Sequence, residues 1–195
     1  MQVHLLTLGA YQTNCYLFYA DGSKQCCVVD PGYDPEFVLE ALKNLNLELE
    51  AILLTHGHFD HVGGVRQLAA DTGCEVYICA EDLSLPEPMT NGKLYYTKTY
   101  ADGDILHLAG LDITVLHTPG HTPGSVCLLS GNTLFSGDTL FAGSCGRVDL
   151  PGGDWATIQK SLKRLKEIEA DLWVLPGHGE ATTLKDEKKY NLYMQ

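Results

Sequence analysis

Basic residues are scarce in this chain of 195 residues. Lys and Arg total 13 against 25 Asp and Glu, which gives a formal net charge of −12 at pH 7. Nucleic acids and anionic membrane surfaces bind proteins through clustered Lys and Arg side chains, so this balance argues against both as partners. We expect the negative charge mainly to keep the protein in solution.

Long apolar runs and paired cysteines are also missing. No run approaches the roughly 20 apolar residues that a membrane-spanning helix needs. The first five residues, MQVHL, contain no basic segment before an apolar core, so we expect no signal peptide. The seven cysteines are odd in number and form no C-x-x-C pair. These features predict a cytoplasmic protein with free thiols and no disulfide framework.

The length fits one domain with its own core, and we expect residues 1–195 to form that domain. Asp34 and Asp154 are each expected to cap a helix, the first of which begins at Pro35, and a short helix is expected after Gly64. Residues 81–98 resemble a loop that borders a site. Apolar runs between turn residues predict short strands at about 3–8, 15–19, 26–30, 51–54, 75–79, 105–108, 111–117, 125–129, 133–136 and 172–175. Many short strands with few helices predict a layered α/β architecture.

The densest group of reactive side chains lies in residues 55–64, THGHFDHVGG, directly after the apolar run 51–54. It contains three imidazoles and one carboxylate: His56, His58, His61 and Asp60. Imidazole nitrogen and carboxylate oxygen are ligands that zinc and similar divalent metals prefer. Buried polar groups at this density need partners. The segment therefore predicts a metal site.

Three further apolar strands end in a tight turn that carries a metal-type ligand. These ligands are His121 between two Pro-Gly turns, Asp138 after Ser136-Gly137, and His178 within PGHG. Seven ligands are too many for one tetrahedral zinc ion but suit two metals that share a carboxylate. Such a pair favours a bridging hydroxide at neutral pH, because a bound water can fall from about 15.7 to near 7 in pKa. That hydroxide would attack an ester-like carbonyl, and the metals would stabilise the oxyanion.

The motifs THGHFDH, PGHTPG, GDTLF and PGHG resemble those of the metallo-β-lactamase superfamily and span most of the chain. The resemblance implies a four-layer αββα sandwich with the metals at one edge of the two sheets. It implies that His56, His58 and His121 hold one metal, that Asp60, His61 and His178 hold the other, and that Asp138 bridges them. Asp60 and Asp138 become the expected catalytic carboxylates. Asp30, in VVDPG, matches the family's aspartate that orients the histidine loop.

Within the superfamily, the run GDTLFAGSCGRVDLPGGD resembles a short bacterial branch of the glyoxalase II group. The group hydrolyses S-acyl-glutathione thioesters such as S-lactoylglutathione, and Arg147 matches a position that contacts substrate. We therefore expect a small-molecule thioester as partner and two divalent ions as cofactors, with zinc first and iron or manganese as alternatives. The chain ends soon after His178, without the helical domain with which full-length enzymes bind glutathione. Asp149 stands where those enzymes carry an aromatic residue. Both departures favour thioester chemistry over glutathione recognition.

Other functions compete with this interpretation. Persulfide dioxygenases share the fold and a similar G-D-x-L…G-C-G-R run, so an iron oxygenase is the main alternative. β-Lactamases of the superfamily typically lack the bridging aspartate, and a tRNA-processing nuclease fits poorly with the acidic chain. A purely structural metal site would be closed and rich in cysteine. The acyl group, the thiol carrier, the oligomeric state, the role of Cys145 and closure of the loop 81–98 stay open.

The remaining histidines and a few other conspicuous residues have plainer interpretations. His4 and His107 are expected to be ordinary strand residues, and His117 is expected to support the site rather than bind metal. The adjacent Tyr95 and Tyr96 could equally line a pocket or pack the loop down.

Overall fold

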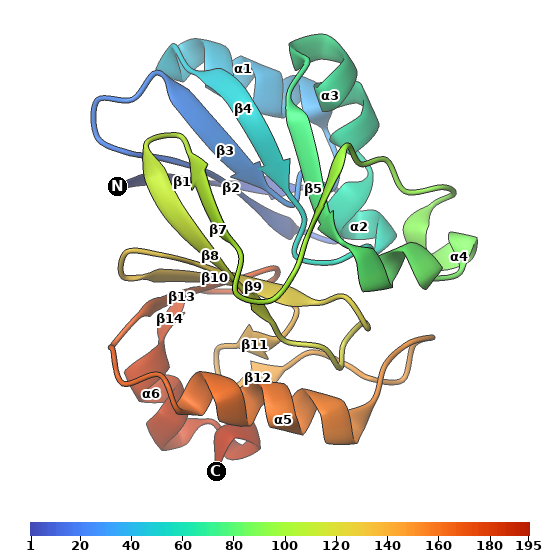
Figure 1. Ribbon diagram of the computed structural model, residues 1–195, viewed down its shortest axis with the longest axis vertical. Coiled ribbons are helices and arrows are strands. Elements are labelled where there is room, and N and C mark those ends of the chain that lie inside the picture. The colour runs from blue at the N-terminus through green and yellow to red at the C-terminus, as the bar shows by residue number, and fades with distance from the viewer.

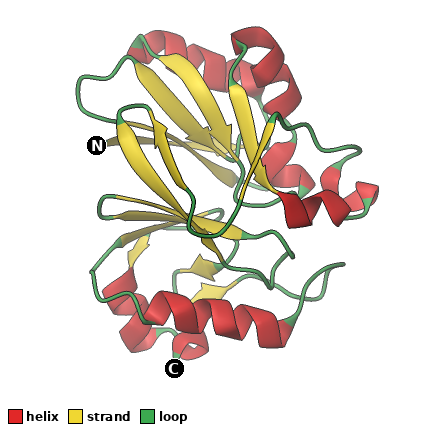
Figure 2. Ribbon diagram, in the orientation of Figure 1, coloured by secondary structure: helices red, strands yellow, loops and turns green.

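The computed structural model describes residues 1–195 and consists of two six-stranded β-sheets packed face to face, with helices over both outer faces (Figures 1 and 2). The first sheet has the order β1 (Gln2–Leu8), β2 (Thr13–Tyr19), β3 (Gln25–Val29), β4 (Glu48–Leu53), β5 (Glu75–Cys79) and β6 (Lys98–Tyr100). The second has the order β14 (Thr182–Thr183), β13 (Trp173–Pro176), β10 (Thr133–Gly137), β9 (Val126–Ser130), β8 (Leu111–His117) and β7 (Ile105–Leu108). A small hairpin pairs β11 (Leu140–Phe141) with β12 (Ser144–Cys145).

The longer helices form the two outer layers. In Figure 1 the blue-to-green helices of the N-terminal half lie over one sheet and the orange-to-red helices of the C-terminal part lie over the other. Helices α1 (Pro35–Leu45) and α3 (Val65–Thr72) cover the first sheet, and α5 (Trp155–Lys166) and α6 (Leu184–Tyr190) cover the second. Short helical turns connect other elements: α2 (Phe59–Val62), η1 (Ala80–Ser84), α4 (Glu87–Thr90) and η2 (Leu192–Met194). The architecture is the expected α/β sandwich of four layers, αββα.

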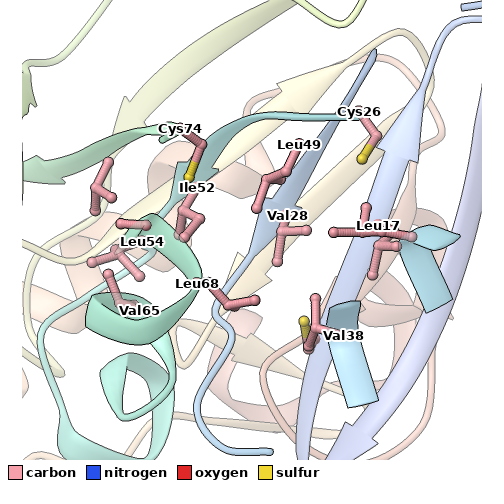
Figure 3. Packing of buried hydrophobic residues seen from close by; sticks show 14 of the residues in the cluster. Leu17, Cys26, Val28, Val38, Leu49, Ile52, Leu54, Val65, Leu68 and Cys74 are labelled. Carbon is pink, nitrogen blue, oxygen red and sulfur yellow. The ribbon is translucent and has the colours of Figure 1, made fainter. Parts of the chain in front are cut away.

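Strand β4 shows why an unbroken apolar run forms a strand in this fold. Ile52 and the following Leu54 pack under the helices with Val38 and Leu68, in a cluster of 16 buried residues (Figure 3). The intervening Leu53 points the other way, into the core between the sheets. Successive side chains of a strand alternate between faces, so a strand that is covered on both faces must be apolar throughout.

The parallel strands β3, β4, β5 and β6 point their carboxyl ends toward one edge of the first sheet. Parallel strands β10 and β13 do the same in the second sheet. Strand β9 is antiparallel to both β8 and β10, so β8 runs in the same direction as β10 and its carboxyl end lies at the same edge. Chemically active residues in open α/β sheets gather outside such strand ends. The segments that follow β4, β8, β10 and β13 carry the seven predicted metal ligands.

Most predicted elements are confirmed, and the exceptions have physical causes. Asp154 caps α5 through a hydrogen bond from Thr157 N–H, whereas Asp34 does not cap α1. Its backbone is left-handed, with φ of 50°, and its carboxylate accepts a hydrogen bond from Gly9 N–H instead. The segment 81–98 contains one helical turn, α4, in addition to most of η1. No helix is both long and apolar enough to cross a membrane.

Candidate metal centre

The first group of donors combines the loop after β4 with the loop after β8. His56, His58 and His121 are nearly inaccessible to solvent, with exposures of 1%, 4% and 2%. One ligand atom from each lies within 4.8 Å of the others, and His58 Nδ1 approaches His121 Nε2 to 2.9 Å. Two ring nitrogens at this separation converge on a shared space. This spacing suits a single metal ion bound by three imidazoles.

The second group combines helix α2 with the turn after β13. His178 Nε2 lies 3.2 Å from both His61 Nε2 and Asp60 Oδ2, and the three side chains again offer ligand atoms within 4.8 Å of one another. His61 is fully buried, whereas Asp60 and His178 are partly exposed. The group therefore faces solvent on one side, where a substrate can approach.

Asp138 lies between the two groups. Its Oδ1 is 3.5 Å from His61 Nε2, and its Oδ2 is 3.6 Å from His121 Nε2 and 3.7 Å from His178 Nε2. One carboxylate thus reaches donors of both groups at once. The structure brings together all seven residues that the sequence singled out as ligands.

Hydrogen bonds outside the donor groups fix the protons of the imidazoles. His61 Nδ1–H donates to Asp30 Oδ2 at 2.9 Å, and His121 Nδ1–H donates to the carbonyl of Arg147 at 2.8 Å. Asp30 also accepts both the backbone N–H and the hydroxyl of Thr55, at 2.8 and 2.6 Å. In the neutral rings these bonds leave the Nε2 lone pairs of His61 and His121 free, as metal ligation requires.

Three of the four buried polar side-chain atoms without a hydrogen-bond partner belong to this site: His56 Nε2, His58 Nε2 and Asp138 Oδ1. Leaving such atoms unpaired normally costs about 1–3 kcal/mol each. His58 presents Nδ1 to the other donors, but His56 Nε2 and Asp138 Oδ1 have no hydrogen-bond partner among them. Unpaired nitrogen and oxygen atoms in such a group are the pattern expected where a cation completes the site. The residues present therefore fit divalent metal ions.

The two donor groups differ in the pKa values of their histidines. Burial and the neighbouring His61 hold the pKa of His56 well below its ordinary value, and burial beside His121 lowers the pKa of His58 to about 4. Burial also opposes a charge on His61, but Asp138 and Asp30 outweigh it and raise its pKa to about 9. Burial likewise opposes the charge of Asp60, but a hydrogen bond from His178 lowers its pKa to about 2. His56 and His58 of the first group are therefore neutral at pH 7, whereas the carboxylates near His61 favour a positive charge in the second group.

A cavity of about 570 Å³ opens onto the two groups. Five of the seven donors line it, and its apolar wall includes side chains that the sequence analysis did not single out: Tyr11, Phe59, Met89, Phe141 and Leu150. Phe59, Phe141 and Leu150 lie within the quoted motifs, and Met89 lies in the segment 81–98 that was expected to border a site. Which apolar side chains of these loops face the cavity depends on the folded chain, so the motifs alone do not identify them.

The structure also places the other residues that the sequence suggested near the site. Arg147 and Cys145 line the cavity, but the guanidinium of Arg147 is paired with Asp149 through two contacts of 2.7 Å. Burial raises the pKa of the Cys145 thiol, which disfavours the thiolate. His117 Nε2–H donates to the Pro123 carbonyl at 2.8 Å and supports the loop that carries His121.

Asp82 is another residue near the site that the sequence analysis did not single out. Its carboxylate is fully buried and accepts hydrogen bonds from both loops of the first donor group. Burial raises its pKa. It stands after a glutamate in an acidic surface segment, and no spacing relates it to the histidines, so nothing in the sequence marks it.

Comparisons with known proteins agree with this geometry. Residues 8–178 match the family described as the metallo-beta-lactamase superfamily. The chain is 34% identical over 209 residues to the hydroxyacylglutathione hydrolase GloC of Haemophilus influenzae, with 100% of this chain and 98% of the relative covered. It resembles the crystal structure of the BLEG-1 B3 metallo-beta-lactamase at 33% identity and a TM-score of 0.90, with both chains fully covered. It resembles TTHA1623 in a di-iron-bound form at 39% identity and a TM-score of 0.85, with 98% and 100% covered.

Proposed function

The chain belongs to the metallo-β-lactamase superfamily, and we propose that it is a hydrolase with two metal ions that cleaves thioesters such as S-lactoylglutathione. The observation that carries this proposal is the position of Asp138 between two groups of three donors. One group suits one ion, and two groups that share a carboxylate suit a pair. Similarity to a hydroxyacylglutathione hydrolase favours the thioester class.

The proposed chemistry uses water as the nucleophile. Two bound divalent ions would supply Lewis acidity and lower the pKa of a coordinated water to near 7. His56, His58 and His121 would hold the first ion, and Asp60, His61 and His178 the second. Asp60, with a pKa of about 2, stays ionised throughout the neutral range. Asp138, which reaches donors of both groups, would be shared by the two ions.

The cavity supports a small substrate with an apolar part. A volume of about 570 Å³ fits the range of small-molecule sites. Tyr11, Phe59 and Met89 offer an apolar surface beside the donors, and Arg147 is the only Lys or Arg of the lining. We infer that the acyl group contacts the apolar wall and that a substrate carboxylate, where present, contacts Arg147.

The proposal also covers the identity of the metal and the cellular compartment. Zinc is the first candidate, and a similar protein with two bound irons makes iron the main alternative. We propose that residues 1–195 act as one catalytic domain in the cytoplasm, since all seven cysteines are free thiols, as is typical of a reducing compartment.

The test is thiol release from S-lactoylglutathione and a panel of other acyl thioesters, with bound metal quantified on the same sample. We expect two metals per chain and release that does not depend on oxygen. Replacing Asp138 by alanine should lower kcat by more than about 100-fold, because even residues that only support metal ligands typically cost 10–100-fold. A β-lactam belongs in the panel because one similar structure is described as a B3 metallo-beta-lactamase. Preference for the β-lactam would contradict the thioester proposal.

A mononuclear iron oxygenase of the same fold is the second candidate, favoured by the run from Gly137 to Arg147 and by iron in a similar structure. One iron per chain together with oxygen uptake on glutathione persulfide would support it. Two metals without oxygen uptake would support the hydrolase.

A further inference from the structure

Asp82 joins the two loops that carry the first donor group. Its Oδ2 accepts hydrogen bonds from the N–H of Gly57 at 2.7 Å and from the hydroxyl of Thr122 at 2.9 Å, and its Oδ1 accepts from the N–H of Gly124 at 2.6 Å. Gly57 is the residue between the first two histidine donors, and Thr122 directly follows the third. One side chain, supplied by η1, thus holds the backbone on both sides of the site.

The two bonds from the backbone N–H groups of Gly57 and Gly124 are shorter than is usual for N–H donors. A carboxylate that accepts N–H and O–H donors forms hydrogen bonds about twice as strong as neutral ones, and a buried charge depends on them because it has left water. A Cβ at Gly124 would stand 2.7 Å from Asp82 Oδ1, so the loop approaches the carboxylate as closely as a glycine allows. No Lys or Arg is among the hydrogen-bond partners of Asp82. The bonds to the two loops therefore stabilise its charge.

Asp30 has the corresponding arrangement on the other side. It accepts hydrogen bonds from Thr55 and from the ring of His61, which belongs to the second donor group. Asp82 contacts no donor ring and acts on the backbone of the loops instead. The two carboxylates therefore support different donors by different means.

We propose that Asp82 is a positioning residue for the metal ion held by His56, His58 and His121, with no comparable effect on the ion held by the second group. The proposal rests on the proposed function insofar as metal ions occupy the two donor groups. Asp82→Asn keeps the size of the side chain but replaces one acceptor oxygen with an amide nitrogen that cannot accept a hydrogen bond. At least one of the three bonds is then lost, and the two loops can separate. Loss of such support typically weakens metal binding by about 10–100-fold.

The decisive measurement is zinc affinity, by competition with a chelator, in two backgrounds that each leave one donor group intact. Asp60→Ala/His178→Ala retains the first group, and His56→Ala/His58→Ala retains the second. Asp82→Asn should raise the zinc dissociation constant tenfold or more in the first background and less than about threefold in the second. An unchanged constant in the first background, or equal changes in both, would overturn the proposal.

A milder pair of variants tests the same link if Asp82→Asn folds poorly. Thr122→Val removes the hydroxyl that donates to Asp82, whereas Thr122→Ser retains it. In the first background Thr122→Val should weaken zinc binding and shift the visible spectrum of the cobalt-loaded protein, and Thr122→Ser should restore both. Equal zinc affinity and equal spectra for the valine and serine variants would contradict the role of Asp82.

These measurements separate the positioning role from the proposed reaction, because no substrate is present. A protein that shows the expected dependence on Asp82 but hydrolyses no thioester would contradict only the proposed function. If the protein hydrolyses thioesters but the zinc affinity of its first donor group is unchanged by Asp82→Asn, only the positioning role is contradicted.

Discussion

Arg147 and Asp149 form an exposed ion pair at the mouth of the cavity. The guanidinium and carboxylate are 61% and 66% exposed, and Nε and one terminal nitrogen of the guanidinium both donate to the carboxylate. The sequence predicted Arg147 as a substrate contact. If the proposed substrate is anionic, it would have to compete with Asp149 for the guanidinium. A pair that is open to water is easily exchanged, so the competition tunes specificity rather than blocking the site.

We therefore expect Asp149→Asn to raise kcat/KM for an anionic thioester such as S-lactoylglutathione by about two- to fivefold at low salt. The gain should fade at high ionic strength, because salt screens exposed charges. A neutral thioester of similar size is the control and should respond to neither change. Equal gains for the charged and neutral substrates would show that Asp149 acts through something other than the freed guanidinium.

At the scale of elements, helix α5 supports the loop that carries His121. The carbonyl of Gly120 accepts a hydrogen bond from Asp154 N–H at 2.9 Å, and the carbonyl of Pro119 accepts one from Ser161 at 2.7 Å. Gly120 has a φ of 134°, and a Cβ there would stand 2.3 Å from the backbone nitrogen of Ile158. The loop thus lies directly against the first turn of the helix.

Gly120→Ala should therefore destabilise the protein by about 3 kcal/mol or more, because the added methyl must displace helix backbone as well as adopt a strained φ. Gly131→Ala is the matched control, since this glycine also has a positive φ, of 56°, but has no atom within 4 Å of the added carbon. It should cost only about 1–2 kcal/mol. Urea unfolding measures both, and equal losses would argue against the crowding at α5.

For the whole molecule, the sequence predicted the features that leave a local pattern: the apolar residues of strands and the cluster of metal-type ligands. The pattern of apolar residues predicted β5, β7 and β8 at their observed bounds. β5 is buried almost throughout and is apolar after its first residue, whereas β7 and β8 include exposed polar residues and are more buried on one face than on the other. The seven candidate ligands stand out in the sequence because four of them lie within residues 56–61 and the others follow strand ends. Asp82 and the apolar cavity wall were missed, because single residues brought together only by tertiary packing leave no local signal. Helix α4 was missed because Pro86 and Pro88 favour turns as strongly as first helical turns.

The metal-free protein as a whole should be most stable near pH 6.5. His58 has an ordinary pKa of 6.5 and a folded value of about 4, so between these limits the unfolded chain takes up a proton that the folded chain does not, and stability falls as the pH falls. His61 has a folded pKa of about 9. Its stabilisation is fully present below pH 6.5 and is lost as the pH rises through 9. For each of these two histidines the folded and ordinary pKa differ by about two and a half units, which corresponds to roughly 3 kcal/mol per residue.

Urea unfolding of the chelator-treated protein from pH 4 to 9 would trace both limbs. His58→Gln should reduce the acid limb and His61→Gln the alkaline one, because glutamine carries no titratable proton. The remainder of each limb belongs to His56, whose pKa is also lowered, and to His178, whose pKa is raised. Since Asp138 and Asp30 are the main causes of the raised pKa of His61, Asp138→Asn should also shorten the alkaline limb. It should not shorten the acid limb, because Asp138 opposes the lowered pKa of His58. A stability that keeps rising from pH 6.5 to 9 would mean that His61 is neutral in the folded protein, and that its carboxylate neighbours do not attract positive charge to the second donor group.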